Sequence, residues 1–129
     1  MIGKEMAGCG LGKRFVTKVC LLTFVVVGVE QVQAVELLVS GFSSDSVNRH
    51  SMADGKYLGT LSGGTLDGPQ AVILGPDGRL YVANEGQDSV VRYNSATRQF
   101  IDVFVSTGSG GLDGPTGLAF GPDGNLYVA

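Results

Sequence analysis

The sequence predicts an all-β fold built from a repeated unit of short strands. Two stretches, LDGPQAVILGPDGRLYVA at 66–83 and LDGPTGLAFGPDGNLYVA at 112–129, align at an offset of 46 residues. A second pair, LLVSGFSSDSVNR at 37–49 and LYVANEGQDSVVR at 80–92, aligns at an offset of 43. After residue 34 no segment keeps a helical period, and the 21 glycines favour tight turns between short strands.

Within one period the local signals alternate between strand and turn. GPDG at 75–78 places proline at the second position of a turn and glycine at its end, and apolar runs flank it, so 70–84 reads as a β-hairpin. Alternating residues predict a third strand at 89–94 and a fourth at 99–105. The repeat therefore contains four antiparallel strands.

Four short strands in 43 to 46 residues match the blade of a β-propeller. The fold class predicted is therefore a β-propeller fragment, with one complete four-stranded blade at 70–105 flanked by two partial blades. The strands expected in the partial blades are 37–39, 46–50, 57–61, 116–120 and a strand from 126 onward. Because a ring needs about four to eight blades, we expect the chain to be the exported beginning of a longer protein.

The first 34 residues differ from the rest and predict a signal peptide. Basic residues precede VCLLTFVVVGV at 19–29, an uncharged run shorter than the roughly 20 residues of a membrane span. VQA, ending at Ala34, suits cleavage there, which predicts a signal peptide at 1–34 and a secreted or extracytoplasmic propeller domain at 35–129. A retained anchor is the alternative. Cleavage would remove both cysteines, Cys9 and Cys20.

The charge of the mature segment argues against some partners. From Val35 onward, five arginine and lysine residues face ten acidic residues, a net charge of −5. Such a segment lacks the basic surface that nucleic acids require, and no membrane span is expected after cleavage. We expect any charged partner to be a cation.

The residues PTGLAFGPDGNLYVA at 115–129 resemble an NHL repeat, the blade of a six-bladed propeller related to the SMP-30 and gluconolactonase-like proteins. The resemblance covers most of 36–129, and the absence of tryptophan argues against the WD type of blade. In the gluconolactonase-like enzymes a divalent ion at the mouth of the channel is held by Glu, Asn and Asp residues. The resemblance implies a fold rather than an activity, because propellers host many functions.

Acidic residues are expected to gather on one face of the predicted propeller. Connections after second and fourth strands lie on the same side of the blades, and they carry Asp45, Asp67, Asn84, Glu85, Asp88 and Asp113. We expect ligand binding by Asp67, Asn84, Glu85, Asp88 and Asp113, with Asn84 and Glu85 as metal ligands and Ca²⁺ as the cofactor such oxygen ligands suit. The alternative is turn formation, which Asp and Asn favour in any loop.

These observations leave three hypotheses for function. The first is a secreted scaffold that binds a protein, a carbohydrate or another small molecule. The second is a metal-dependent hydrolase or lyase of the gluconolactonase-like type, with some catalytic residues in further blades. The third is a truncated product without activity. No catalytic group is recognisable, since His50 is the lone histidine and no serine has a histidine and an acid at a known spacing.

Several repeated residues have structural interpretations. Asp77 and Asp123 lie inside GPDG turns, where turn chemistry explains them. Arg49 and Arg92 align in the repeat and are expected to be solvated or to brace loops. The equivalent tyrosines Tyr81 and Tyr127 are expected to be needed for folding. His50 aligns with Tyr93, which suggests a side chain that fills space at the end of a strand.

Overall fold

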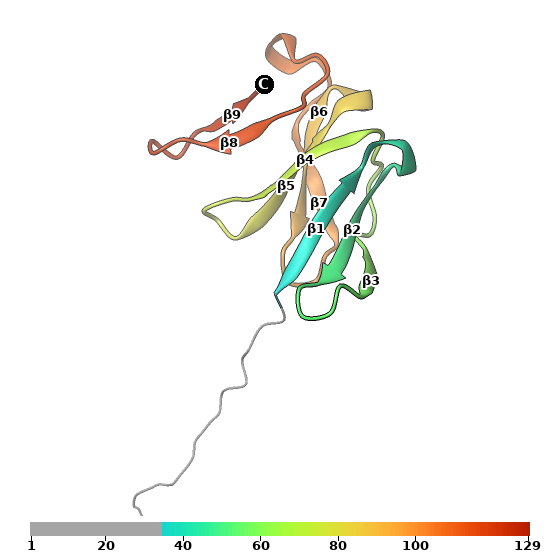
Figure 1. Cartoon of the computed structure of the whole chain (residues 1–129). Coiled ribbons are helices and arrows are strands. Elements are labelled where there is room, and N and C mark those ends of the chain that lie inside the picture. The colour runs from blue at the N-terminus through green and yellow to red at the C-terminus, as the bar shows by residue number, and fades with distance from the viewer. Residues whose placement is uncertain (1–34) are drawn as a thin grey trace, which may run out of the picture. The chain divides into compact units, whose positions relative to one another are not determined.

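The computed structural model describes residues 35–129, and the predicted signal peptide at 1–34 lies outside the described residues. Residues 35–129 contain three antiparallel sheets (Figure 1). The first consists of β1 (Glu36–Gly41), β2 (Ser46–Ser51) and β3 (Tyr57–Thr60). The second consists of β4 (Pro69–Leu74), β5 (Arg79–Asn84), β6 (Ser89–Asn94) and β7 (Phe100–Val105). The third pairs β8 (Leu118–Phe120) with β9 (Leu126–Val128).

This arrangement confirms the all-β prediction and the complete four-stranded sheet between two smaller ones. The strands lie within about two residues of their expected positions. Three short 3₁₀ turns were not predicted: η4 (Phe42–Ser44), η5 (Glu85–Gln87) and η6 (Ser109–Gly111). In the part of the chain that the structure describes, no helix is long and apolar enough to cross a membrane.

The GPDG segments form the same turn in both repeats. Asp77 Oδ1 accepts a hydrogen bond from the backbone N–H of Arg79, and its Oδ2 accepts one from the Tyr81 hydroxyl at 3.0 Å. Gly78 closes the turn with a φ of 79°, which a residue without a β-carbon adopts at little cost. Asp123 bonds the N–H of Asn125 and the hydroxyl of Tyr127 in the same way. Turn chemistry therefore accounts for both aspartates, as predicted.

The hydrophobic core lies between the first and second sheets. Its buried residues come from both sheets and from the segment after β3: Val47, Leu61, Leu80, Val82, Val91 and Tyr93. Alternate residues of each strand point to the same face, so Leu80 and Val82 on β5 face the first sheet together. Burial of these side chains removes them from water, which contributes about 1.5–3 kcal/mol for each large aliphatic side chain.

The opposite face of the second sheet meets the β8–β9 hairpin through aromatic side chains. The Tyr81 ring makes edge-to-face contacts with Phe104 of its own sheet and with Phe120 of β8, at centroid distances of 5.2 and 5.1 Å. Such pairs add about 0.5–1.5 kcal/mol beyond the burial of their surface. Tyr127 occupies the equivalent position of the third sheet, but its side chain is exposed. The two tyrosines therefore have different environments in this chain.

The repeated arginines form ion pairs across strands, and Arg92 also reaches the GPDG turn, where its Nη1 lies 4.0 Å from Asp77 Oδ2. Arg92 Nε and Nη2 bond the two oxygens of Asp102 on β7, at 2.9 and 2.7 Å. Arg49 makes the same paired contact with Glu36 on β1, at 3.1 Å for each bond. The cross-strand pairs follow from the strand register, which places Arg92 beside Asp102 and Arg49 close to Glu36 and which the repeat alignment alone does not show.

Glu36 also links two sheets. Arg98, in the turn between β6 and β7, donates to Glu36 Oε1 through Nε at 3.1 Å and lies 3.0 Å from it through Nη2. The hydrogen bond from Arg49 is the main cause that lowers the pKa of Glu36, and Arg98 lowers it further against the opposing effect of burial. Arg92 likewise lowers the pKa of Asp102.

Candidate functional site

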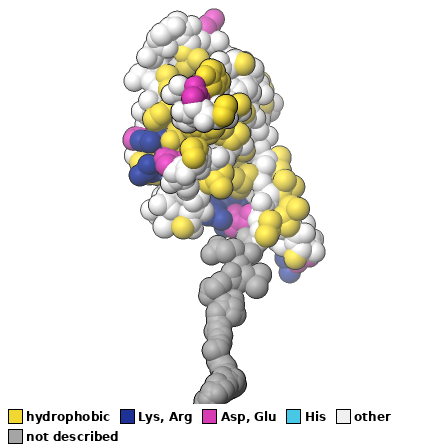
Figure 2. Space-filling model, turned by 90° about the vertical axis from the view of Figure 1, so that its left-hand side faces the viewer, with side chains coloured by type: hydrophobic (Ala, Val, Ile, Leu, Met, Phe, Trp, Pro, Cys, Tyr) yellow, Lys and Arg dark blue, Asp and Glu magenta, His cyan; other side chains and the backbone are white. Residues whose placement is uncertain are grey.

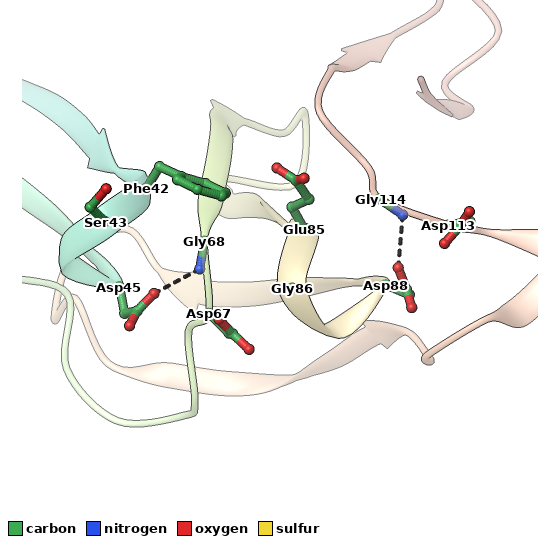
Figure 3. A pocket seen from close by; sticks show the side chains of 10 residues that line it. All are labelled: Phe42, Ser43, Asp45, Asp67, Gly68, Glu85, Gly86, Asp88, Asp113 and Gly114. Carbon is green, nitrogen blue, oxygen red and sulfur yellow. Dashed lines mark hydrogen bonds between the residues drawn. The ribbon is translucent and has the colours of Figure 1, made fainter.

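The loops at one end of the sheets surround a pocket of about 460 Å³, hereafter the acidic pocket (Figure 3). They come from the β1–β2 and β5–β6 connections and from the two segments that enter β4 and β8. The residues that line it are Phe42, Ser43, Asp45, Asp67, Gly68, Glu85, Gly86, Asp88, Asp113 and Gly114. Antiparallel strands return each of these connections to the same end. The structure thus brings together five acidic residues that the sequence analysis placed on one face.

Two of the aspartates hold neighbouring repeats together. Asp45 Oδ1 accepts a hydrogen bond from the backbone N–H of Gly68 at 2.9 Å, and Asp88 Oδ1 accepts one from Gly114 at 2.7 Å (Figure 3). Both aspartates have left-handed backbone conformations, with φ of 49° and 47°. Asp is among the residues that tolerate this conformation best after glycine. Each carboxylate therefore fixes the segment that leads into the next sheet.

Asn84 is the last residue of β5, is fully buried and is not among the residues that line the pocket. Its Oδ1 accepts a hydrogen bond from the Asp67 N–H at 2.7 Å, and its Nδ2 donates to the Thr65 carbonyl at 3.1 Å. Buried amide groups are normally paired in this way, because an unpaired one costs about 1–3 kcal/mol. Asn84 thus positions the segment that carries Asp67. Sequence reasoning missed this role, since the partner lies seventeen residues away.

Asp67 and Glu85 are each hydrogen-bonded to a neighbouring segment. The Gly86 N–H donates to the Asp67 carbonyl at 2.8 Å, which joins η5 to the segment before β4. A β-carbon on Gly86 would lie 2.5 Å from Asp67 Cγ, so a larger residue there would displace the Asp67 side chain. The Glu85 carboxylate accepts a hydrogen bond from the Gln70 side chain. Asp67 and Asp113, which occupy equivalent positions in the two LDGP segments, are exposed.

The pocket has a strongly negative character. Asp45, Asp67, Glu85, Asp88 and Asp113 contribute five carboxylates, and none of the described residues that line the pocket is basic. Carboxylates gathered in a hollow focus the electric field and raise the local concentration of cations. The arrangement can therefore attract a positively charged ligand and orient hydrogen-bond donors.

The carboxylates surround one pocket, but they lie too far apart to form a metal-binding cluster. Among residues 35–129, no group of three or more His, Cys, Asp or Glu side chains is placed to hold a metal ion. Both polar ends of the Asn84 side chain already bond the backbone. Ligation of Ca²⁺ by Asn84 and Glu85 stays a prediction.

His50 takes no part in the acidic pocket. It lies on β2, where its ring contacts Tyr57 edge to face at 5.7 Å and its Nδ1 lies 3.3 Å from the Gly55 carbonyl oxygen. His50 is partly buried, and the Tyr57 ring beside it is exposed. The aligned Tyr93, in contrast, is fully buried in the core.

Small antiparallel sheets that follow one another in the chain, stacked face to face with loops gathered at one end, are compatible with a β-propeller. A solved structure of hydrazine synthase from Kuenenia stuttgartiensis, a propeller-containing protein, is similar to this chain. The match covers 73% of the chain with 32% identity and a TM-score of 0.60. The chain spans 25% of the length of that protein chain. No protein-family model and no curated protein matches.

Proposed function

We propose that this chain is part of an exported NHL-type propeller that acts as a binding scaffold, and that the acidic pocket receives its ligand. The ligand class that fits is a positively charged segment of a partner protein, because lysine and arginine side chains can meet several separate carboxylates at once. The observation that supports this proposal is the placement of five carboxylates, from four different connections, around one pocket.

Two groups of carboxylates have different tasks in this proposal. Asp45 and Asp88 bond the backbone of the following repeats and give the pocket its shape. Asp67 and Asp113 are exposed at its rim, and Glu85 lies between them on η5. The ligand would contact mainly Asp67, Glu85 and Asp113. A rigid frame that carries exposed charges favours tight binding, because its loops and side chains lose little conformational entropy when the ligand binds.

Titration with a fluorescently labelled hexalysine peptide, followed by fluorescence anisotropy at low salt, tests this proposal. We expect the Asp67→Asn/Asp113→Asn variant to bind about tenfold more weakly, which corresponds to a loss of about 1.4 kcal/mol. Asp54→Asn/Asp123→Asn removes the same charge elsewhere, because both residues lie in exposed turns, between β2 and β3 and between β8 and β9. This control should bind almost normally. Equal weakening by both variants would show a response to net charge and would contradict the proposal.

Calorimetric titration with CaCl₂ tests the metal-dependent alternative. If Asn84 and Glu85 bind Ca²⁺, the unchanged chain gives heat that Glu85→Ala abolishes. The glutamate is the better variant to use, since Asn84 is buried and its replacement would also weaken the fold. A titration without heat would favour the scaffold.

Export is tested by the N-terminus of the mature product. Mass spectrometry of the protein recovered outside the cytoplasm of its source should show a chain that begins at Val35. A product that keeps residues 1–34 would contradict the predicted cleavage.

A further inference from the structure

One aromatic ring stands among the carboxylates that line the acidic pocket. Phe42, the first residue of η4, is 53% exposed there. Its ring lies over the segment that enters the second sheet, since a β-carbon on Gly68 would come within 2.7 Å of Phe42 Cε1. Figure 3 shows the ring above Gly68, with the Glu85 carboxylate on the same side of the pocket. The pocket thus combines an open aromatic face with negative charge.

The position of Phe42 recurs in the next repeat. Phe42 aligns with Glu85 at the offset of 43 residues. Phe42 approaches Gly68, and Glu85 approaches Gly114, where a β-carbon would lie 3.8 Å from Glu85 Cγ. Each of these glycines belongs to the LDGP segment that enters the following sheet. The Phe42 ring is therefore held at the contact between the first and second sheets, both of which the structure describes.

The chain already holds one guanidinium between an aromatic ring and a carboxylate. Arg92 Cζ lies 4.6 Å from the centroid of the Phe104 ring, while Arg92 bonds both oxygens of Asp102. A guanidinium suits this pair of groups because it is planar, stacks on aromatic faces and donates two parallel hydrogen bonds to one carboxylate. The acidic pocket offers the same two kinds of group.

The arginines of the described chain are engaged elsewhere. Within residues 35–129, the four arginines form ion pairs with Glu36, Asp77 and Asp102. None of these three acidic residues lines the acidic pocket. On the face drawn in Figure 2, the arginine and lysine side chains likewise lie beside acidic ones. A guanidinium stacked on Phe42 must therefore come from a ligand.

We propose that the acidic pocket selects arginine over lysine, with an arginine of the partner protein stacked on Phe42 and hydrogen-bonded to the pocket carboxylates. This inference rests on the proposed function, which it narrows from cationic segments in general to segments that carry arginine. An ammonium group is compact and strongly hydrated, so it gains less from an aromatic face than a guanidinium does. Phe42 is then the residue that determines specificity, and the carboxylates supply the general attraction for cations.

Fluorescence anisotropy with labelled hexa-arginine and hexalysine peptides at the same low salt concentration tests the proposal. We expect the unchanged chain to bind hexa-arginine more tightly than hexalysine. Phe42→Leu keeps a hydrophobic side chain but removes the ring, and should weaken hexa-arginine binding by about two- to fivefold while changing hexalysine binding less. The readout is the ratio of the two affinities, because a partly unfolded variant would lose both affinities alike.

Controls separate the effect of the ring from that of the charges. Tyr57→Leu removes an exposed aromatic ring on β3, outside the acidic pocket, and should leave the ratio unchanged. Asp67→Asn/Asp113→Asn should weaken binding of both peptides. Equal affinities for the two peptides, or an arginine preference that Phe42→Leu leaves intact, would overturn this inference and leave the proposed function standing. Binding of neither peptide would overturn both.

Discussion

The carboxylate of Asp88 accepts a hydrogen bond from the backbone N–H of Gly114 at 2.7 Å. One repeat earlier, Asp45 bonds Gly68 in the same way. Each bond spans the boundary between two sheets, from the loop inside one sheet to the LDGP segment that enters the next. Because both recur at equivalent positions, they are a regular feature of how successive repeats are joined.

Replacement of Asp88 should weaken the attachment of the third sheet. Asp88→Ala removes a hydrogen bond made by a charged group, which is worth about 1.5–3 kcal/mol, and places alanine in a left-handed conformation that it adopts poorly. Asparagine keeps a hydrogen-bond acceptor and tolerates the left-handed conformation, so Asp88→Asn should lower the free energy of unfolding less than Asp88→Ala. Urea unfolding measures the two free energies. Equal stability of Asp88→Ala and the unchanged chain would contradict this role.

The Glu36 ion pairs predict a loss of stability in acid. Arg49 and Arg98 hold the pKa of Glu36 below its usual 4.5, so the folded state binds this proton less readily than the unfolded chain. The stabilisation is complete above pH 4.5 and is lost as the pH falls through the lowered pKa. Urea midpoints measured from neutral to acid pH should fall less steeply in Glu36→Gln. Parallel curves for the two proteins would contradict this account.

Tyr81 and Tyr127 should differ in their importance for stability, although they align in the repeat. Tyr81 is 4% exposed and packs between Phe104 and Phe120, so Tyr81→Ala should cost about 3–5 kcal/mol. Tyr81→Phe should cost about 1 kcal/mol through loss of the bond to Asp77. Tyr127→Phe loses the same bond at an exposed site and should cost less. Thermal unfolding compares Tyr81→Phe with Tyr127→Phe directly. Equal losses of stability in these two variants would contradict the predicted difference between the tyrosines.

Glu85 should matter for binding more than for folding. Its side chain is partly exposed at the acidic pocket and bonds only the Gln70 side chain among the contacts that the structure describes. Surface substitutions of this kind usually change stability by less than about 0.5 kcal/mol. Glu85→Gln should therefore keep the urea midpoint and weaken hexalysine binding. A large fall in the midpoint would show that Glu85 is part of the fold.

The repeat made the strands and turns predictable. GPDG fixes a turn from local residue chemistry, and alternation in SVVRYN identifies a strand without knowledge of its neighbours. Comparison of the two repeats then showed which strand and turn patterns recur and which occur only once. The side on which the acidic residues gather followed from the alternation of antiparallel strands. The placement of Asp45, Asp67, Glu85, Asp88 and Asp113 around one pocket agrees with that reasoning.

Roles that depend on distant partners could not be predicted. Arg92 pairs with Asp102 because of the register between β6 and β7, and that register shifts beside Arg92. Asn84 bonds Asp67 and Thr65, which lie seventeen and nineteen residues earlier, and nothing in the local sequence indicates these partners. Tyr127 bonds Asp123 as Tyr81 bonds Asp77, but its side chain is exposed. In each case the sequence showed which contacts the side chain can make, but it did not show which residues lie beside that side chain in the fold.

Nuclear magnetic resonance of the ¹⁵N-labelled chain, titrated with unlabelled hexalysine, tests the central claim most directly. Backbone amides of Gly68, Gly86 and Gly114 lie at the acidic pocket, and those of Gly78 and Gly124 lie in the GPDG turns between β4 and β5 and between β8 and β9. We predict saturable shifts at the first group and almost none at the second. Shifts at the GPDG turns, or equal shifts in both groups, would contradict a ligand site at the acidic pocket.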